Sequence, residues 1–249
     1  MAKEGIPSIY DYTLDELKEK LKPSFRAKQV YNWLYKKYAN SYDEMKNIPN
    51  ELKEDLKANY PIDVMTIIKK EQSIDGSIKY LFKLRDNLTV EAVLLLMKDK
   101  KKDEDGNIIR SEKYTVCISS QVGCKVGCTF CLTAKGGFVR NLTVGEYIAQ
   151  IVNIKRDNDI AENKALNIVY MGMGEPLDNF TNFIKAVSIF SELDGLAISR
   201  RRQTVSTSGI ASKIEKLGQI DLGIQLAISL HAVDDELRSE LIPMNKAYN

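Results

Sequence analysis

Residues 117–131 read Cys-Ile-Ser-Ser-Gln-Val-Gly-Cys-Lys-Val-Gly-Cys-Thr-Phe-Cys, and this stretch holds all four cysteines of the 249-residue chain. The last three, Cys124, Cys128 and Cys131, have the spacing C-x3-C-x2-C and follow a β-rich run. Three thiolates from one loop suit an iron–sulfur cluster, because they leave one iron open to an exogenous ligand. The stretch therefore predicts a reactive metal centre beside a strand end.

A structural zinc site is the alternative that these residues leave open. Such a site takes four protein ligands, so zinc would need Cys117 or His231, the only histidine, in addition to the three clustered cysteines. A disulfide framework is disfavoured, because all the cysteines are confined to one short segment.

Predicted strands and helices alternate after the cysteines. Strands are expected at 166–170, 203–206 and 222–230, and helices from Thr143, over 179–193, from Ile210 and from Asp234. This alternation is typical of parallel βα units, although the units are too few for a closed eight-stranded barrel. We therefore expect an α/β fold in which residues 110–249 form a partial (βα) barrel.

A small N-terminal helical domain is expected at residues 1–66. Thr13 and Glu16 can form a capping box. The next helix, expected over 25–39, interleaves basic and aromatic residues that could contact RNA phosphates and bases: Arg26, Lys28, Lys36 and Lys37 with Tyr31, Trp33, Tyr35 and Tyr38. The same aromatic stripe is also compatible with a buried core, with Val30, Leu34 and Tyr38 on one face.

A β-rich connector is expected at residues 67–109, between the helices and the barrel. Short β-rich runs at 78–84, 88–97 and 114–119 are separated by Asp-Asn and Asp-Gly turn signals. The charged stretch 98–105 is expected to be a solvated loop.

The composition is that of a soluble globular protein, with 44% hydrophobic and 28% charged residues. A net charge of +2 neither demands nor excludes a nucleic-acid partner. No stretch approaches the roughly 20 apolar residues of a membrane span, and residues 1–10 carry charges and a proline where a secretory leader would be apolar. We therefore expect a cytoplasmic protein without membrane contact.

Four motifs in order carry a resemblance to a known family. They are Val-Cys-Ile-Ser-Ser-Gln-Val-Gly-Cys at 116–124, Met-Gly-Met-Gly-Glu-Pro-Leu-Asp-Asn at 171–179, Ser-Thr-Ser-Gly at 206–209 and Ala-Ile-Ser-Leu-His-Ala at 227–232. Together with the cysteine loop they resemble the RlmN family of the radical S-adenosylmethionine (SAM) superfamily. The resemblance implies a 4Fe-4S cluster, whose open iron chelates SAM.

The SAM contacts are expected at the carboxyl ends of the strands. Gly174 and Glu175 follow an apolar strand, where ligand sites of βα folds collect, and glycine permits close backbone approach. Ser206 ends the next strand, and Ser229, Leu230 and His231 end the one after. The resemblance implies that these positions bind SAM, although a lone histidine at a strand end is more often structural.

Glu91 and Cys117 are the expected catalytic residues. Glu91 interrupts an otherwise apolar strand, where it would have a raised pKa if buried, or would face solvent if strand alternation turns it outward. The resemblance implies that Glu91 is the proton acceptor. It also implies that Cys117 attacks a cysteine near the carboxyl terminus, releasing methylated RNA as a disulfide forms.

The resemblance implies methylation of the C2 carbon of adenine in 23S rRNA and tRNA through a methyl-carrying cysteine, with an electron donor such as flavodoxin. That cysteine is missing from the 249 residues, so we expect an incomplete, inactive chain. Two alternatives remain open: a Cfr-type enzyme that methylates the C8 carbon, and a non-catalytic, metal-stabilised RNA-binding module.

Overall fold

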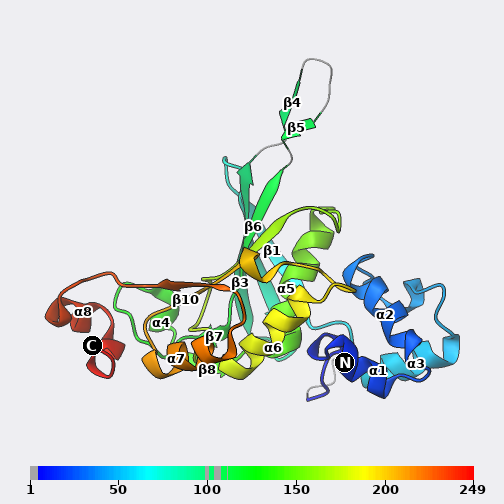
Figure 1. Cartoon of the computed structure of the whole chain (residues 1–249), viewed down its shortest axis with the longest axis horizontal. Coiled ribbons are helices and arrows are strands. Elements are labelled where there is room, and N and C mark those ends of the chain that lie inside the picture. Colours follow the sequence, from blue (N-terminus) through cyan, green and yellow to red (C-terminus); the bar gives the residue numbers. More distant parts are fainter. Residues whose placement is uncertain (1–4, 99–100, 104–107, 111) are drawn as a thin grey trace.

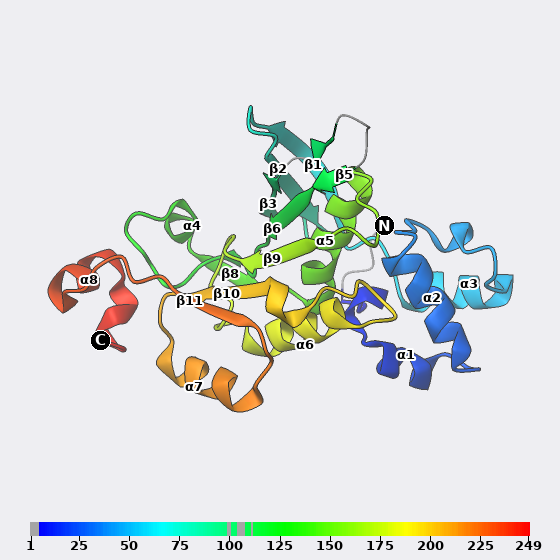
Figure 2. The ribbon, with the colours of Figure 1, turned by 45° about the horizontal axis from the view of Figure 1, so that its top comes forward.

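The computed structural model describes residues 5–98, 101–103, 108–110 and 112–249. Its centre (Figure 1) is a seven-stranded sheet in the order β1-β2-β3-β6-β9-β10-β11, whose strands are labelled in Figure 2. These strands span Met65–Gln72 (β1), Ile78–Leu84 (β2), Thr89–Lys98 (β3), Lys113–Cys117 (β6), Leu166–Tyr170 (β9), Gln203–Thr207 (β10) and Gln225–Ile228 (β11). Two pairs of short strands stand apart: Lys101–Lys102 (β4) with Ile108–Arg110 (β5), and Gln121–Gly123 (β7) with Phe138–Asn141 (β8).

The sheet changes from antiparallel to parallel at β6. Strand β6 runs antiparallel to β3 but parallel to β9, and β10 and β11 continue in the parallel direction. Parallel neighbours need crossover connections, which contain α5 (Val144–Asp157), α6 (Phe180–Ser191) and α7 (Ala211–Ile220). The predicted α/β fold with parallel βα units is confirmed. Within the described residues, no helix combines the length and the apolar character that crossing a membrane requires.

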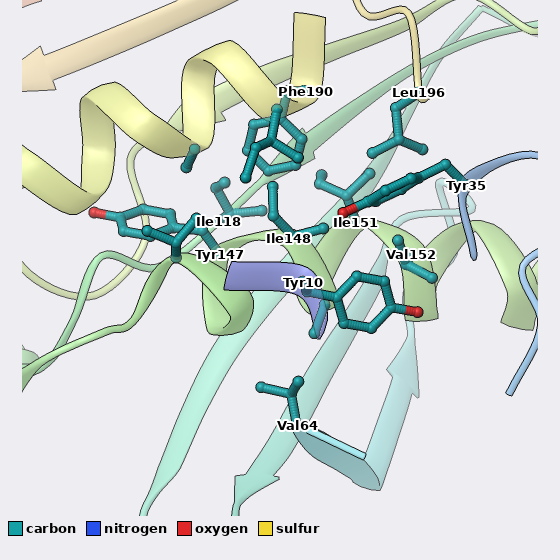
Figure 3. Packing of buried hydrophobic residues seen from close by; sticks show 14 of the residues in the cluster. Tyr10, Tyr35, Val64, Ile118, Tyr147, Ile148, Ile151, Val152, Phe190 and Leu196 are labelled. Atoms are coloured by element: carbon teal, nitrogen blue, oxygen red, sulfur yellow. The ribbon is translucent and has the colours of Figure 1, made fainter. Parts of the chain in front are cut away.

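Helices α5 and α6 cover one face of the sheet. The ring of Tyr170 in β9 packs edge-on against Phe183 of α6, with centroids 4.8 Å apart, and lies 6.1 Å from the ring of Tyr147 in α5. Figure 3 shows part of this layer, where Tyr147 and Ile148 lie near Ile118. Side chains alternate between buried and half-buried along β9 and β10. The half-buried ones point to the opposite face, which we call the open face.

The N-terminal region is helical, with α1 at Leu14–Lys20, α2 at Phe25–Tyr35 and α3 at Asn50–Asn59. These helices lie at one end of the molecule, while α4 (Leu132–Lys135) and α8 (Asp235–Leu241) lie at the other (Figures 1 and 2). The capping box of Thr13 and Glu16 forms as predicted. The apolar residues of the helices belong to the same hydrophobic core as the sheet, so the helices stabilise this end of the sheet.

Helix α2 is shorter than predicted, and two of its aromatic residues lie in the core. It ends at Tyr35, so Tyr38 is not on its face and instead takes a left-handed conformation with φ of 52°. The rings of Tyr31 and Tyr35 are 0% and 1% exposed. Of the two interpretations that the sequence left open for these rings, the buried core is confirmed, because they pack in the core beside Tyr10.

Short elements account for the other differences. Strand β3 continues to Lys98 and β4 occupies 101–102, inside the stretch expected to be a loop; residues 99–100 and 104–105 lie outside the described part. Strand β1 begins at Met65, two residues before Ile67, where the β-rich connector was expected to begin. Strands β7 and β8 and helix α4 were not predicted, since three or four residues carry no measurable periodicity.

Candidate active site

The cysteine loop, residues 124–131, leaves the sheet through β7 and returns through α4 and β8. The two strands pair antiparallel, with Gln121 opposite Asn141. At the start of the loop the Cys124 N–H donates to the carbonyl oxygen of Gly137 at 3.0 Å, and at its end the Cys131 N–H donates to that of Cys128 at 3.1 Å. These backbone hydrogen bonds fix the positions of Cys124 and Cys131 at the two ends of the loop.

A cavity of about 340 Å³ lies between this loop and the carboxyl ends of β9, β10 and β11. Its size is within the range of small-molecule sites. Most of the residues predicted to bind the cluster and SAM line it: Cys124, Cys128, Cys131, Gly174, Glu175, Ser206, Ser229 and His231. Leu230, Glu91 and Cys117 are not among its lining residues. The clustered cysteines and the residues at the strand ends therefore lie around one cavity, as expected from the common rim of parallel strands.

The three thiols fit a cluster that draws one ligand from each cysteine. All are half-buried and free of disulfides. Burial, together with smaller contributions from Glu175 and the other two thiols, raises the pKa of Cys124 to about 11. Because metals bind the thiolate, a cationic centre in the cavity would have to lower this pKa. No three His, Cys, Asp or Glu side chains of the described residues converge on one ion position. A 4Fe-4S cluster does not require this, because each cysteine binds a different iron.

The Glu175 carboxylate is occupied by internal hydrogen bonds. One oxygen, Oε2, accepts from the N–H and the hydroxyl of Ser208, both at 2.8 Å, and Oε1 accepts from the Leu177 N–H at 3.1 Å. Glu175 is 4% exposed, so this carboxylate ties the loop after β9 to the loop after β10. Sequence reasoning missed Ser208, although it lies inside the Ser-Thr-Ser-Gly motif.

We expect Ser208→Ala to lower the free energy of unfolding by about 1.5–3 kcal/mol, because a buried carboxylate loses a hydrogen-bond donor. Urea denaturation of the apoprotein measures this loss. Ser212→Ala is the matched control, since its exposed hydroxyl contacts only that of Tyr248 among the described side chains; we expect a change within about 0.5 kcal/mol there. Equal effects of the two substitutions would show that the Glu175 contact contributes nothing.

Gly174 lets the loop after β9 lie flat against the cysteine-bearing segment. It has a φ of 94°, and a Cβ placed there would lie 2.5 Å from the Cβ of Gln121. Neither the conformation nor the space admits a side chain. The glycine thus permits close packing against residues 120–121. Gly174 also lines the cavity, and its close approach to a ligand stays a prediction.

Two pairs of side chains line the far wall of the cavity. The hydroxyl oxygens of Ser206 and Ser229 lie 3.0 Å apart, bridging the ends of β10 and β11. His231, with a φ of 59°, places its ring 4.7 Å from the ring of Phe130 in the cysteine loop. Paired hydroxyls can hydrogen-bond a polar ligand. The two rings are tilted by 51° to each other, so either ring can offer its face to a planar group of a ligand.

Glu91 and Cys117 lie on the open face of the sheet, outside this cavity. Cys117 is directly opposite Val93, and Glu91 is two residues before Val93, so the side chains of Glu91 and Cys117 share a face. The Glu91 side chain is 46% exposed, and its Oε1 lies 3.3 Å from the Nζ of Lys79. The interpretation of Glu91 as a buried carboxylate is therefore wrong, because strand alternation turns it outward. Burial raises the pKa of the Cys117 thiol.

An ion pair that sequence reasoning missed joins the cysteine loop to the loop after β9. The Nζ of Lys125 lies 2.7 Å from Asp178, whose other oxygen accepts a hydrogen bond from Gln121 at 2.8 Å. Both acceptor oxygens of a mostly buried carboxylate are thus used. The pair holds the first turn of the cysteine loop against the cavity wall.

A parallel βα sheet with a C-x3-C-x2-C loop at its carboxyl rim defines the class of radical SAM proteins, and residues 118–248 match the model of the radical SAM superfamily. A solved radical SAM methyltransferase from Sphaerobacter thermophilus superposes with a TM-score of 0.87 at 40% identity, over 97% of this chain and 69% of that chain. Residues 10–62 match the ribosomal RNA large subunit methyltransferase N-terminal domain.

The relatives narrow the class to one family. The dual-specificity RNA methyltransferase RlmN of Aliarcobacter butzleri is 90% identical over 249 residues, which is 100% of this chain and 69% of that protein. The protein of the same description in Wolinella succinogenes is 64% identical over 242 residues, 97% of this chain and 67% of that protein. The chain belongs to the RlmN family. The resemblance seen in the motifs is confirmed, and the family favours an enzyme over a non-catalytic module.

Proposed function

We propose that this protein is a radical SAM methyltransferase that methylates the C2 carbon of adenine in RNA. The observation that carries the proposal is the shared cavity, in which the three clustered cysteines face Gly174, Ser206 and Ser229. The C2 carbon is not nucleophilic, so polar methyl transfer cannot reach it and radical chemistry is required. The description of the relatives as dual-specificity RNA methyltransferases supports 23S rRNA and tRNA as the two substrates.

The cavity residues divide between the two cofactors. Cys124, Cys128 and Cys131 would hold a 4Fe-4S cluster, which when bound supplies an electron to SAM. The backbone at Gly174, the two serine hydroxyls and the rings of Phe130 and His231 would hold SAM against it. Glu175 would act through its backbone, because its carboxylate is already occupied. Leu230 would contribute from the cavity edge, beside Ser229.

The open face would carry the acid–base and thiol chemistry. We infer that Glu91 accepts the proton from adenine and that Cys117 resolves the enzyme–RNA adduct. The Lys79 ammonium lies 3.3 Å from Oε1 of Glu91 and would orient this carboxylate on the open face. The raised pKa of Cys117 keeps this thiol protonated, and so unreactive, until a base is near.

The remaining parts of the proposal concern organisation and partners. Residues 1–66 would form an RNA-binding domain, 67–109 a connector and 110–249 the catalytic core. Flavodoxin, or a donor of similar potential, would reduce the cluster in the cytoplasm. The sequence has no cysteine besides the four at 117–131, so we expect this chain alone to bind RNA and SAM without turnover.

Deleting the whole cellular gene that contains the coding sequence of these 249 residues should remove 2-methyladenosine from the cell's 23S rRNA and tRNA, because no polar methyltransferase can replace a radical reaction at C2. Mass spectrometry of nucleosides from purified RNA measures the loss, and restoring the gene should restore the modification. Unchanged 2-methyladenosine in the deletion strain would refute the proposal. Loss of 8-methyladenosine instead would assign the C8 reaction.

A further inference from the structure

A second cavity lies at the other end of the parallel strands from the cysteines. Its volume is about 310 Å³, and it is lined by the segments that lead into β9 and β10, residues 162–166, 196–199 and Arg202, together with Lys155 of α5. At about 3.3 Å per residue, the five-residue strand β9 puts it some 17 Å from the cysteine cavity. Nothing in the proposed chemistry uses it.

The lining of this cavity is cationic. Three of its side chains, Lys155, Lys164 and Arg202, carry positive charge, against one carboxylate, Glu162. Lys164 is paired with Glu112 at 3.1 Å. Within the described part of the chain, Lys155 and Arg202 form no ion pair, so the cavity has two cations that no acidic side chain neutralises directly.

Lys155 is buried, and its contacts with the protein do not replace all the hydrogen bonds that its ammonium group would make with water. The residue is 1% exposed. Its Nζ has one long hydrogen bond, 3.5 Å to the carbonyl oxygen of Ala161, and lies 5.3 Å from the ring centroid of Tyr38. Burial lowers the pKa of Lys155 to about 8, which leaves it mostly charged at neutral pH. An ammonium has three donors, so capacity for an anion remains.

Tyr38 adds a second unsatisfied group beside the lysine. Its hydroxyl is buried and has no hydrogen-bond partner among the described residues. Such groups are rare in folded proteins unless a ligand or water serves them. Tyr38 does not itself line the cavity, but it contacts Lys155, which does. A buried lysine and an arginine that line one cavity match the oxygen atoms of a phosphate group.

The surroundings favour a polynucleotide over a single free phosphate. Arg200 and Arg201 are exposed in the same turn as Arg202. Lys28 of α2 is paired with Asp194 at 2.9 Å and is not counted with them. Positive charge therefore continues from the cavity along the turn 200–202, as repeated phosphates require.

We propose that this cavity binds one backbone phosphate of the RNA, with Lys155 and Arg202 as its charged ligands. The proposal rests on the proposed function only in taking RNA as the ligand. The site would hold the RNA at the end of the parallel strands remote from the cysteine cavity, where the helical N-terminal region meets the sheet.

The test compares RNA binding by the full chain and three variants across a series of salt concentrations, with a fluorescent adenine-containing RNA hairpin. We expect Arg202→Gln and Lys155→Met each to raise Kd about tenfold and to reduce the salt slope by about one. Arg200→Gln removes the same charge from the same turn without lining the cavity. It should raise Kd no more than about twofold, through weaker long-range attraction.

Each outcome separates the possibilities. Equal losses in Arg200→Gln and Arg202→Gln would overturn the cavity in favour of diffuse attraction, and unchanged binding in Arg202→Gln and Lys155→Met would overturn it outright. If inorganic phosphate raises the Tm of the wild type but not of Arg202→Gln, while both bind RNA equally, the cavity takes a small anion and the RNA proposal falls. Absence of RNA binding by the wild type would refute the proposed function as well.

Discussion

Replacing any one of Cys124, Cys128 or Cys131 by alanine should abolish cluster binding after anaerobic reconstitution, whereas the wild-type chain should hold about four irons. The reason is that each of the three thiols would be the single protein ligand of one iron. None of the described residues lining the cavity offers a further thiol. Iron and sulfide analysis, together with the brown absorption of the cluster, measures the loss without any need for turnover.

Cys117→Ala is the matched control, because it removes the fourth cysteine of the same segment. Cys117 lies on β6, opposite Val93, and does not line the cavity. The variant should therefore keep the full iron content. Loss of iron in Cys117→Ala, or a colourless protein that retains zinc, would show a four-ligand structural site and would contradict the cluster.

The strands of the parallel sheet could be predicted closely from sequence, because alternating or continuous apolar runs bounded by turns record which strands are buried. Strand β9 occupies the predicted residues 166–170, and β2 the predicted 78–84. Strand β11 is shorter than the predicted 222–230, spanning Gln225–Ile228. Its four residue pairs with β10 end at Thr207 and Ile228, and β10 itself ends at Thr207, so the length of the partner strand limits β11 whatever its apolar content.

The site could be predicted where function depends on strand ends and not where it depends on packing between distant segments. Ser206, Ser229 and His231 were located because carboxyl ends of parallel strands meet at one rim. The Glu175–Ser208 and Lys125–Asp178 contacts link residues 33 and 53 positions apart. No local pattern reports such pairings. The burial of Lys155 is equally hidden, since a lysine in an amphipathic helix normally faces solvent.

Gly123→Ala should destabilise the protein by more than about 3 kcal/mol and prevent cluster assembly, because a backbone clash adds to a strained conformation. Gly123 has a φ of 75°, and a Cβ placed there would lie 1.8 Å from the carbonyl oxygen of Gly137. That same oxygen accepts the hydrogen bond of the Cys124 N–H. A side chain at 123 therefore forces β7 away from β8 at the point where the cysteine loop begins.

Gly137→Ala separates the clash from the conformational strain. Gly137 lies in the same hairpin with a φ of 71°, but a Cβ there would meet nothing within 4 Å. Its cost should be the strain alone, about 1–2 kcal/mol, and it should still bind iron. Urea denaturation of both apoproteins and iron content after reconstitution measure the difference. Similar stability and iron binding in the two variants would mean that the closure of β7 on β8 does not position the cysteines, because only Gly123→Ala disturbs that closure.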